Sequence, residues 1–318
     1  MKAARLVGPR RFAFEEAPTP TPKDGELLVR MEYFSVCGSD LRTYDRVFPE
    51  EEYPFRLGAP CHECVGVVEE SHDSRFKKGD HIIALQAGGL LEYAAVPGNR
   101  AVTIPNMGDP ASWVLCQPVG TVLYAVRQMG NIIGKTVVII GQGPIGLSFT
   151  DLVVRQGARR VIVADKHDYR LEMSKKLGAT HTINVGRENL VEAVAEITKG
   201  ALADITVEAC GRPEAAHQIF ECLRMQGTAI VFGLAHDEPI FPFNWSLLED
   251  KLPRIIATNS ARSGDMAEAV ETLVDLVSQG RMSVEHLLTH RLGWSEVGKA
   301  YEIYSNKAEQ SLKVVMNV

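Results

Sequence analysis

A glycine-rich turn between an apolar run and a helical run constrains the fold of this chain more than any other feature of its sequence. Its residues are Gly141, Gln142, Gly143, Pro144, Ile145 and Gly146. The preceding run 136–140 is apolar and β-branched, and the following run 147–155 is helical in character. In this setting Gly141 permits a tight turn, Gly143 lets the backbone approach a pyrophosphate, and Gly146 allows close packing of helix on strand. The turn, including Pro144 and Ile145, therefore predicts a dinucleotide-binding site at the N-terminus of a helix.

An acidic residue follows the turn at the distance that such a site requires. Asp165 ends the next apolar strand, about 20 residues after Gly146. Its carboxylate can accept hydrogen bonds from the adenosine ribose hydroxyls and would repel a 2′-phosphate, which favours NAD over NADP. Lys166 and Arg170 lie close enough in the sequence to keep NADP open, and Arg170 is counted with the cofactor-binding candidates.

Apolar strands alternate with helical stretches through the middle of the chain. The expected strands are 136–140, 160–164, 205–208 and 228–232. Because a parallel sheet needs a crossover helix between successive strands, this alternation predicts an α/β domain whose doubly wound parallel sheet carries helices on both faces.

The flanking segments follow other patterns. The N-terminal third is rich in proline and glycine and has short β-like runs such as 26–31 and 65–68, which indicates a compact β-rich domain. Near the C-terminus an amphipathic run at 266–278 predicts a helix, and 312–316 predicts a strand. We therefore expect three parts: a β-rich domain at 1–117, a nucleotide-binding domain at 118–258, and a segment at 259–318 that returns to the first domain.

Charge and hydropathy narrow the class of partner. The chain has 34 basic and 40 acidic residues, a formal net charge of −6, and no basic cluster, which argues against a nucleic acid. It has no run of roughly 18 apolar residues and no apolar signal core after Met1, so neither a membrane partner nor secretion is expected. We expect a cytoplasmic protein that acts on a small molecule.

Two short segments of the β-rich part carry side chains that suit zinc. Cys37, Ser39 and Asp40 lie in a turn after a β-like run, and the run 61–64 reads Cys-His-Glu-Cys. Thiolate, imidazole and carboxylate are zinc ligands, and six cysteines without a regular framework favour metal binding or burial over disulfides in a reducing compartment. A purely structural role for each residue, and a metal or redox pair formed by the two cysteines of 61–64, stay open at this point.

The order and spacing of these motifs resemble those of the zinc-containing medium-chain dehydrogenases. The resemblance spans essentially the full chain and rests on the Cys37 turn, His62 with Glu63, the runs 78–83 and 91–97, and the turn at 141–146. The pattern looks like the branch that contains sorbitol and other polyol dehydrogenases, threonine dehydrogenase and archaeal glucose dehydrogenases. In that family a GroES-like catalytic domain flanks a Rossmann domain, so the resemblance implies the same architecture here.

The resemblance also implies a metal site. The matching residues of the family surround one catalytic zinc, which carries over onto Cys37, His62 and Glu63. The step into the Rossmann domain resembles the family's Glu-Pro or Gln-Pro step, and Gln117 is the preferred fourth ligand. Cys116 is the alternative, because a thiolate binds zinc more strongly than an amide does.

A proton relay is the third implication of the resemblance. Zinc would lower the pKa of a bound alcohol, Ser39 is expected to take its proton, and the hydride passes to the nicotinamide. Asp40 is expected to orient His62, with a surface-turn role as the alternative, and Glu63 is counted with Ser39 and Asp40 as catalytic. Arg42 stands where the family often has a histidine, so the outer end of the relay stays open.

The chain departs from the family pattern between Ile83 and Gly88. A lobe with four cysteines and a second, structural zinc is missing there, so one zinc per chain is expected. The expected substrate is a secondary alcohol or ketone of a small polyol, sugar, cyclitol or amino alcohol, and the expected assembly is a homodimer or homotetramer. A zinc-independent NADPH quinone or enoyl reductase and a non-catalytic nucleotide-binding protein are the alternatives.

Overall fold

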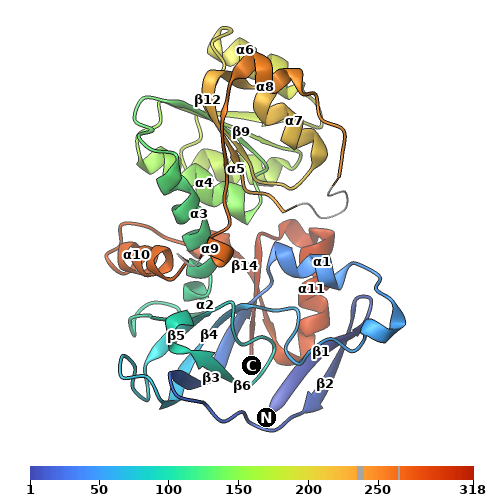
Figure 1. Ribbon diagram of the computed structural model, residues 1–318, viewed down its shortest axis with the longest axis vertical. Coiled ribbons are helices and arrows are strands. Elements are labelled where there is room, and N and C mark those ends of the chain that lie inside the picture. Colours follow the sequence, from blue (N-terminus) through green and yellow to red (C-terminus); the bar gives the residue numbers. More distant parts are fainter. Residues whose placement is uncertain (235–239, 264–265) are drawn as a thin grey trace. The chain divides into compact units, whose positions relative to one another are not determined.

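The computed structural model describes residues 1–234, 240–263 and 266–318. The chain divides into two compact units (Figure 1). The first comprises Met1–Gly120 and Gly264–Val318, and the second comprises Thr121–Ser263. The sequence led us to expect the divisions at residues 117 and 258.

A mixed sheet is the framework of the first unit. Over the described residues its order is β14-β15-β3-β4-β5-β7, and β6 pairs with β3. The bounds are β3 (Glu26–Ser35), β4 (Glu63–Ser71), β5 (His81–Leu85), β6 (Tyr93–Pro97), β7 (Ala101–Thr103), β14 (Leu288–Gly293) and β15 (Lys313–Asn317). The C-terminal strand β15 pairs antiparallel with β3, which brings strands from the N-terminal and C-terminal parts of the chain into one sheet.

Smaller elements complete the first unit. They are the antiparallel pair β1 (Lys2–Gly8) and β2 (Arg11–Glu16), and the helices α1 (Leu41–Tyr44), α2 (Pro110–Trp113), α10 (Met266–Ser278) and α11 (Val297–Asn306). The helix α3 (Cys116–Gln128) begins in this unit. The apolar stripe expected at 266–278 forms α10, whose residues Val270, Leu273 and Val274 are buried.

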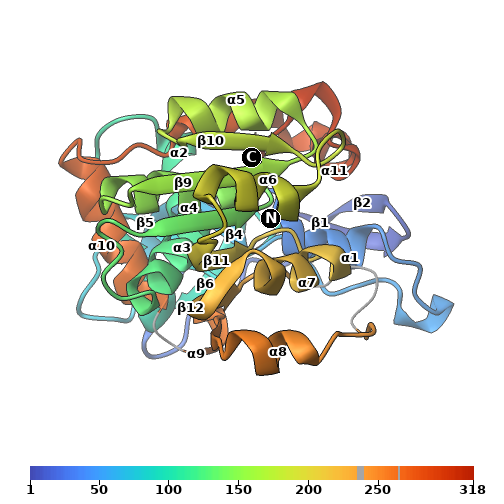
Figure 2. The ribbon, with the colours of Figure 1, turned by 90° about the horizontal axis from the view of Figure 1, so that it is seen from above.

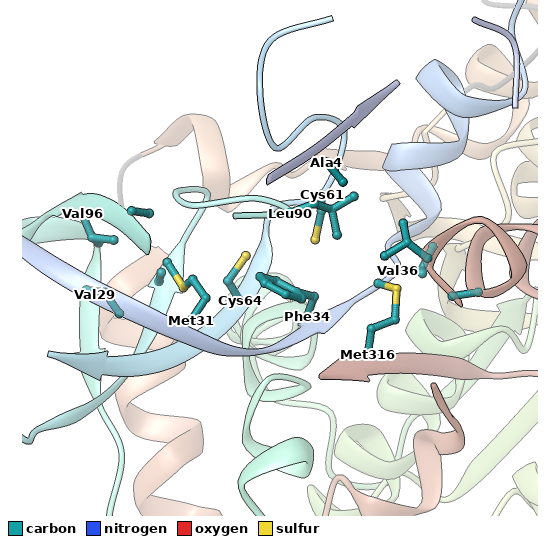
Figure 3. Packing of buried hydrophobic residues seen from close by; sticks show 14 of the residues in the cluster. Ala4, Val29, Met31, Phe34, Val36, Cys61, Cys64, Leu90, Val96 and Met316 are labelled. Atoms are coloured by element: carbon teal, nitrogen blue, oxygen red, sulfur yellow. The ribbon is translucent and has the colours of Figure 1, made fainter. Parts of the chain in front are cut away.

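A hydrophobic core contains both cysteines of the run 61–64. Cys61 and Cys64 are fully buried. Figure 3 shows them among Met31, Phe34 and Leu90. Buried thiols in such surroundings behave as small hydrophobic side chains. Over the described ranges neither cysteine belongs to a cluster of three potential metal ligands, so a metal site built on this pair has no support.

A parallel sheet is the framework of the second unit. In the described part of the chain its order is β10-β9-β8-β11-β12-β13, and every neighbouring pair is parallel. The bounds are β8 (Thr136–Ile140), β9 (Arg160–Asp165), β10 (His181–Asn184), β11 (Ala203–Glu208), β12 (Leu223–Val231) and β13 (Arg254–Ala257). Numbered along the chain, this is the order 3-2-1-4-5-6 of a dinucleotide-binding sheet, and ligands bind at the carboxyl ends where the order reverses.

Helices cover both faces of this sheet (Figure 2). Their bounds are α4 (Pro144–Arg155), α5 (Asp168–Lys176), α6 (Leu190–Thr198), α7 (Pro213–Glu221) and α8 (Ser246–Lys251). The short α9 (Ser260–Ser263) follows β13 at the end of the unit. All residues of the central strand β8 are buried, which requires cover on both sides. The predicted fold class, a β-rich domain with a doubly wound parallel sheet, is confirmed. Within the described ranges, no helix combines the length and apolarity that crossing a bilayer demands.

Candidate functional site

A cysteine, a histidine and a glutamate meet in the first unit. The potential ligand atoms of Cys37, His62 and Glu63 all lie within 4.8 Å of one another. Cys37 precedes a short 3-10 turn at Gly38–Asp40, His62 directly precedes β4, and Glu63 is the first residue of β4. Since β3 and β4 are antiparallel and Ser35 pairs with Glu63, the sheet register brings the two motifs together. These donors have the chemistry that zinc prefers.

Asp40 holds the imidazole of His62. The Nδ1 atom of His62 lies 2.7 Å from Oδ1 of Asp40. The other carboxylate oxygen of Asp40 accepts hydrogen bonds from the Cys37 N–H at 3.0 Å and from the Tyr301 hydroxyl at 3.1 Å. A carboxylate on one ring nitrogen fixes the orientation of the other, as in many metal-binding histidines. Tyr301, on α11, was not predicted from the sequence.

The same contacts set the protonation of His62 when no metal is bound. Burial opposes the charged imidazolium, but the charges of Asp40 and Cys37 outweigh it and raise the pKa of His62 well above its ordinary value. A metal ligand must be neutral imidazole, so a proton and a metal ion compete for this ring.

Ser39 lies between two residues of the cluster. Its Oγ atom is 3.2 Å from Sγ of Cys37 and 3.3 Å from Nε2 of His62. A hydroxyl can both donate and accept a hydrogen bond, and rotation about its C–O bond lets this one donate to either neighbour. The residue expected to relay a proton therefore lies at the cluster.

Gln117 lies beside His62. Its Nε2 donates to the His62 carbonyl oxygen at 3.1 Å. Its Oε1 is buried and has no hydrogen-bond partner within the described ranges, and such an acceptor is costly unless a ligand satisfies it. The neighbouring Cys116 is also fully buried, and burial raises the pKa of its thiol to about 12, which disfavours the thiolate.

Lys313 is a residue of this site that was not predicted from the sequence. Its Nζ donates to the two carboxylate oxygens of Glu63 at 2.8 and 2.7 Å and to the Val36 carbonyl oxygen at 3.0 Å. Lys313 is 2% exposed and Glu63 1%. Burial alone would lower the pKa of the lysine, but the carboxylate outweighs it and raises that pKa above its ordinary value. The signal in the sequence was a lysine in the otherwise apolar run 312–316, because a buried lysine needs a partner.

In the second unit the glycine turn follows β8. Gly141 has a φ of +95°, and a Cβ atom there would lie 2.8 Å from Cβ of Cys210. A Cβ atom on Gly146 would lie 1.8 Å from the Gly141 carbonyl oxygen, so neither position can carry a side chain. Gly143 is the N-cap of α4, and Pro144 and Ile145 form its first turn and are half-buried. The free N–H groups of this helix end suit an anion.

Asp165, the last residue of β9, lies next to the turn. Its Oδ2 accepts a hydrogen bond from the Gln142 N–H at 2.7 Å, and its Oδ1 accepts one from the His167 N–H at 2.9 Å. Nη1 of Arg170 is 3.7 Å from Oδ2, whereas Lys166 is exposed. The structure thus brings together the turn, Asp165 and Arg170.

Comparison with known proteins identifies the family. Residues 23–106 match the alcohol dehydrogenase GroES-like domain, and residues 144–276 match the zinc-binding dehydrogenase domain. The chain belongs to the zinc-type medium-chain alcohol and polyol dehydrogenases. This confirms the family and the GroES-like and Rossmann architecture expected from the sequence.

Full-length relatives support the same assignment to the alcohol dehydrogenases. The L-threonine 3-dehydrogenase of Bacillus velezensis is 26% identical, and the match covers 91% of each chain. The sorbitol dehydrogenase of Halalkalibacterium halodurans is also 26% identical, over 97% of this chain and 96% of the relative. The alcohol dehydrogenase TADH from Thermus sp. ATN1 has the same fold, with a TM-score of 0.88, 24% identity and complete coverage of both chains. These comparisons confirm the predicted activity. The protein is an oxidoreductase that transfers a hydride between a small alcohol or ketone and a nicotinamide cofactor.

Proposed function

We propose that this alcohol dehydrogenase contains one catalytic zinc, uses NAD, and interconverts a secondary alcohol and a ketone in a small polyol, sugar, cyclitol or amino alcohol. The main support for this proposal is that the potential ligand atoms of Cys37, His62 and Glu63 all lie within 4.8 Å of one another. The unpaired Oε1 of the adjacent Gln117 adds an oxygen to the sulfur, nitrogen and carboxylate oxygen of these three residues, and the four donors fit zinc. A homodimer or homotetramer stays a prediction.

The residues that would hold zinc are Cys37, His62, Glu63 and Gln117. Gln117 is favoured over Cys116 as the fourth ligand because its amide contacts His62 and its Oε1 needs a partner, whereas Cys116 is not part of the cluster of ligand atoms found in the described residues. Bound zinc would act as a Lewis acid that lowers the pKa of the substrate alcohol.

The chain's own residues would then handle the proton and the orientation of the ligands. Ser39 would hold the alcohol proton at Oγ, since that hydroxyl already contacts the cluster. Asp40 would keep the imidazole of His62 in one orientation and one tautomer. Lys313 would offset the charge of Glu63 and so limit the negative charge of the cluster.

Replacing Asp40 with asparagine should lower the affinity for zinc about 10- to 100-fold, because the side chain keeps its shape but loses the charge that fixes His62. Competition with a coloured zinc chelator measures this affinity. Asp45→Asn is the matched control, since Asp45 is an exposed residue that pairs with Arg10. Equal zinc affinities for wild type and Asp40→Asn would refute the orienting role.

NAD is favoured over NADP because Asp165 lies beside the dinucleotide turn, where its charge would repel a 2′-phosphate. Asp165→Asn keeps an acceptor for the Gln142 N–H and removes that charge. The ratio of kcat/KM for NAD to that for NADP should fall on the order of a hundredfold, since a like-charge contact costs several kcal/mol. Asp168→Asn, at an exposed position on α5, is the control. A ratio that does not change in Asp165→Asn would mean that this carboxylate does not select the cofactor.

The proposed activity is tested by following NADH absorbance with a panel of polyols, sugars, cyclitols and amino alcohols. We expect NAD reduction with at least one secondary alcohol in the panel. If cofactor binds but no alcohol is oxidised and no ketone reduced, the proposal fails.

A further inference from the structure

A closed network of buried polar side chains lies behind the glycine turn. Gln142, Thr150 and Ser174 are each fully buried. Oε1 of Gln142 accepts hydrogen bonds from the Thr150 and Ser174 hydroxyls, both at 2.8 Å, and its Nε2 donates to the Gly141 carbonyl oxygen at 2.9 Å. Thr150 belongs to α4 and Ser174 to α5, so one amide joins the turn to two helices.

The hydrogen bonds of Gln142 fix the position of the glycine turn relative to α4 and α5, which an apolar side chain could not do. A buried amide costs free energy unless it is hydrogen-bonded, and here both lone-pair positions of Oε1 are used. An apolar residue in place of Gln142 could fill the space, but it would not fix the turn relative to α4 and α5.

The backbone of Gln142 provides a second link. Its N–H donates to Oδ2 of Asp165 at 2.7 Å. Oγ of Ser174 also lies 2.8 Å from the carbonyl oxygen of Arg170, which is the alternative acceptor for its single hydrogen. The Arg170 guanidinium lies 3.7 Å from both Oδ2 of Asp165 and the place that a Cβ of Gly143 would occupy. Gln142 thus lies at the junction of the turn, the carboxylate and the helix that carries the arginine.

We propose that Gln142 is a positioning residue that fixes the phosphate-facing turn relative to Asp165 and Arg170 and thereby sets the affinity for the nicotinamide dinucleotide. The role rests on the dinucleotide site proposed above. Because its side chain is fully buried, Gln142 acts through the backbone of the turn. The turn lies on the phosphate side of the proposed site and would hold the cofactor equally before and during hydride transfer. Loss of the network should therefore weaken binding and leave the chemical step nearly unchanged.

The full-length Gln142→Ala variant tests this role. The Kd for NADH, from the change in its fluorescence, should rise about tenfold, the size expected for losing buried hydrogen bonds. The kcat at saturating NAD should stay within about twofold of wild type. The fold should persist because the Thr150 and Ser174 hydroxyls still reach the carbonyl oxygens of Gly146 and Arg170.

Two further variants separate positioning from general stability. Gln128→Ala removes another amide link of the same unit, from α3 to the Thr258 hydroxyl at 3.2 Å, and should leave the Kd for NADH unchanged. The double variant Thr150→Val with Ser174→Ala leaves the turn sequence intact and should raise that Kd. Adding it to Gln142→Ala should bring little further increase, because both changes break the same network.

The outcomes distinguish the two proposals. If wild type binds NADH but the Kd is unchanged in Gln142→Ala, the positioning role is wrong and the dinucleotide site stands. The same conclusion follows if the Kd rises equally in Gln142→Ala and Gln128→Ala. A wild-type protein that binds no NADH would overturn the dinucleotide site and this role with it.

Discussion

Replacing Lys313 with methionine should destabilise the metal-free protein by about 3–5 kcal/mol, the cost of breaking a buried ion pair from one side. Methionine has a similar volume, but it leaves the Glu63 carboxylate in the interior without its positive partner. Urea unfolding of chelator-treated protein measures the loss. Added zinc should reduce this loss of stability, because the metal would take the place of Lys313 as the positive partner of Glu63.

Two controls make the Lys313 result specific. Lys299→Met breaks the exposed pair with Glu296 and should change stability little, because surface pairs contribute little. Adding Glu63→Gln to Lys313→Met should restore much of the stability, because no unpaired charge is then buried. If Lys313→Met and Lys299→Met had equal free energies of unfolding, the ion pair with Lys313 would not be what stabilises the buried Glu63 carboxylate.

Replacing Cys37 with alanine should remove the zinc and lower kcat/KM on the order of a thousandfold, as expected when several kcal/mol of Lewis-acid stabilisation is lost. Metal analysis and NADH absorbance measure the two effects. Cys222→Ala, at a fully buried thiol in the core of the second unit, should keep both zinc and turnover. A Cys37→Ala protein with wild-type zinc content and activity would show that this thiol is not a ligand.

Four strands of the second unit's sheet could be predicted because their signals are local, whereas the edge strands β10 and β13 were not among the expected strands. The strand expected at 136–140 is β8, since a run of β-branched residues ends at glycine. The strand expected at 228–232 corresponds to β12, which begins earlier, at Leu223, and ends at Val231. Its early part was missed because Arg224 and Gln226 interrupt the apolar pattern, and both Met225 and Gln226 are exposed.

The candidate site could be predicted only where its residues share a short motif. Cys37, Ser39 and Asp40 lie in one turn, and His62 and Glu63 are adjacent at the start of β4, so ligand chemistry and the family resemblance point to them. The Glu63–Lys313 pair joins residues 250 positions apart, and the Tyr301–Asp40 hydrogen bond spans 261. Such contacts depend on the pairing of β15 with β3 and on the placement of α11, which no local pattern encodes.

We propose that Cys37, His62 and Glu63 form a zinc site on which NAD-linked alcohol oxidation depends. Metal analysis of the purified protein, combined with turnover before and after chelation, is the experiment that decides this. We expect one zinc per chain, loss of NAD reduction on chelation, and its return when Zn²⁺ is added. A zinc-free protein whose NADPH-linked reduction survives chelation would contradict the claim.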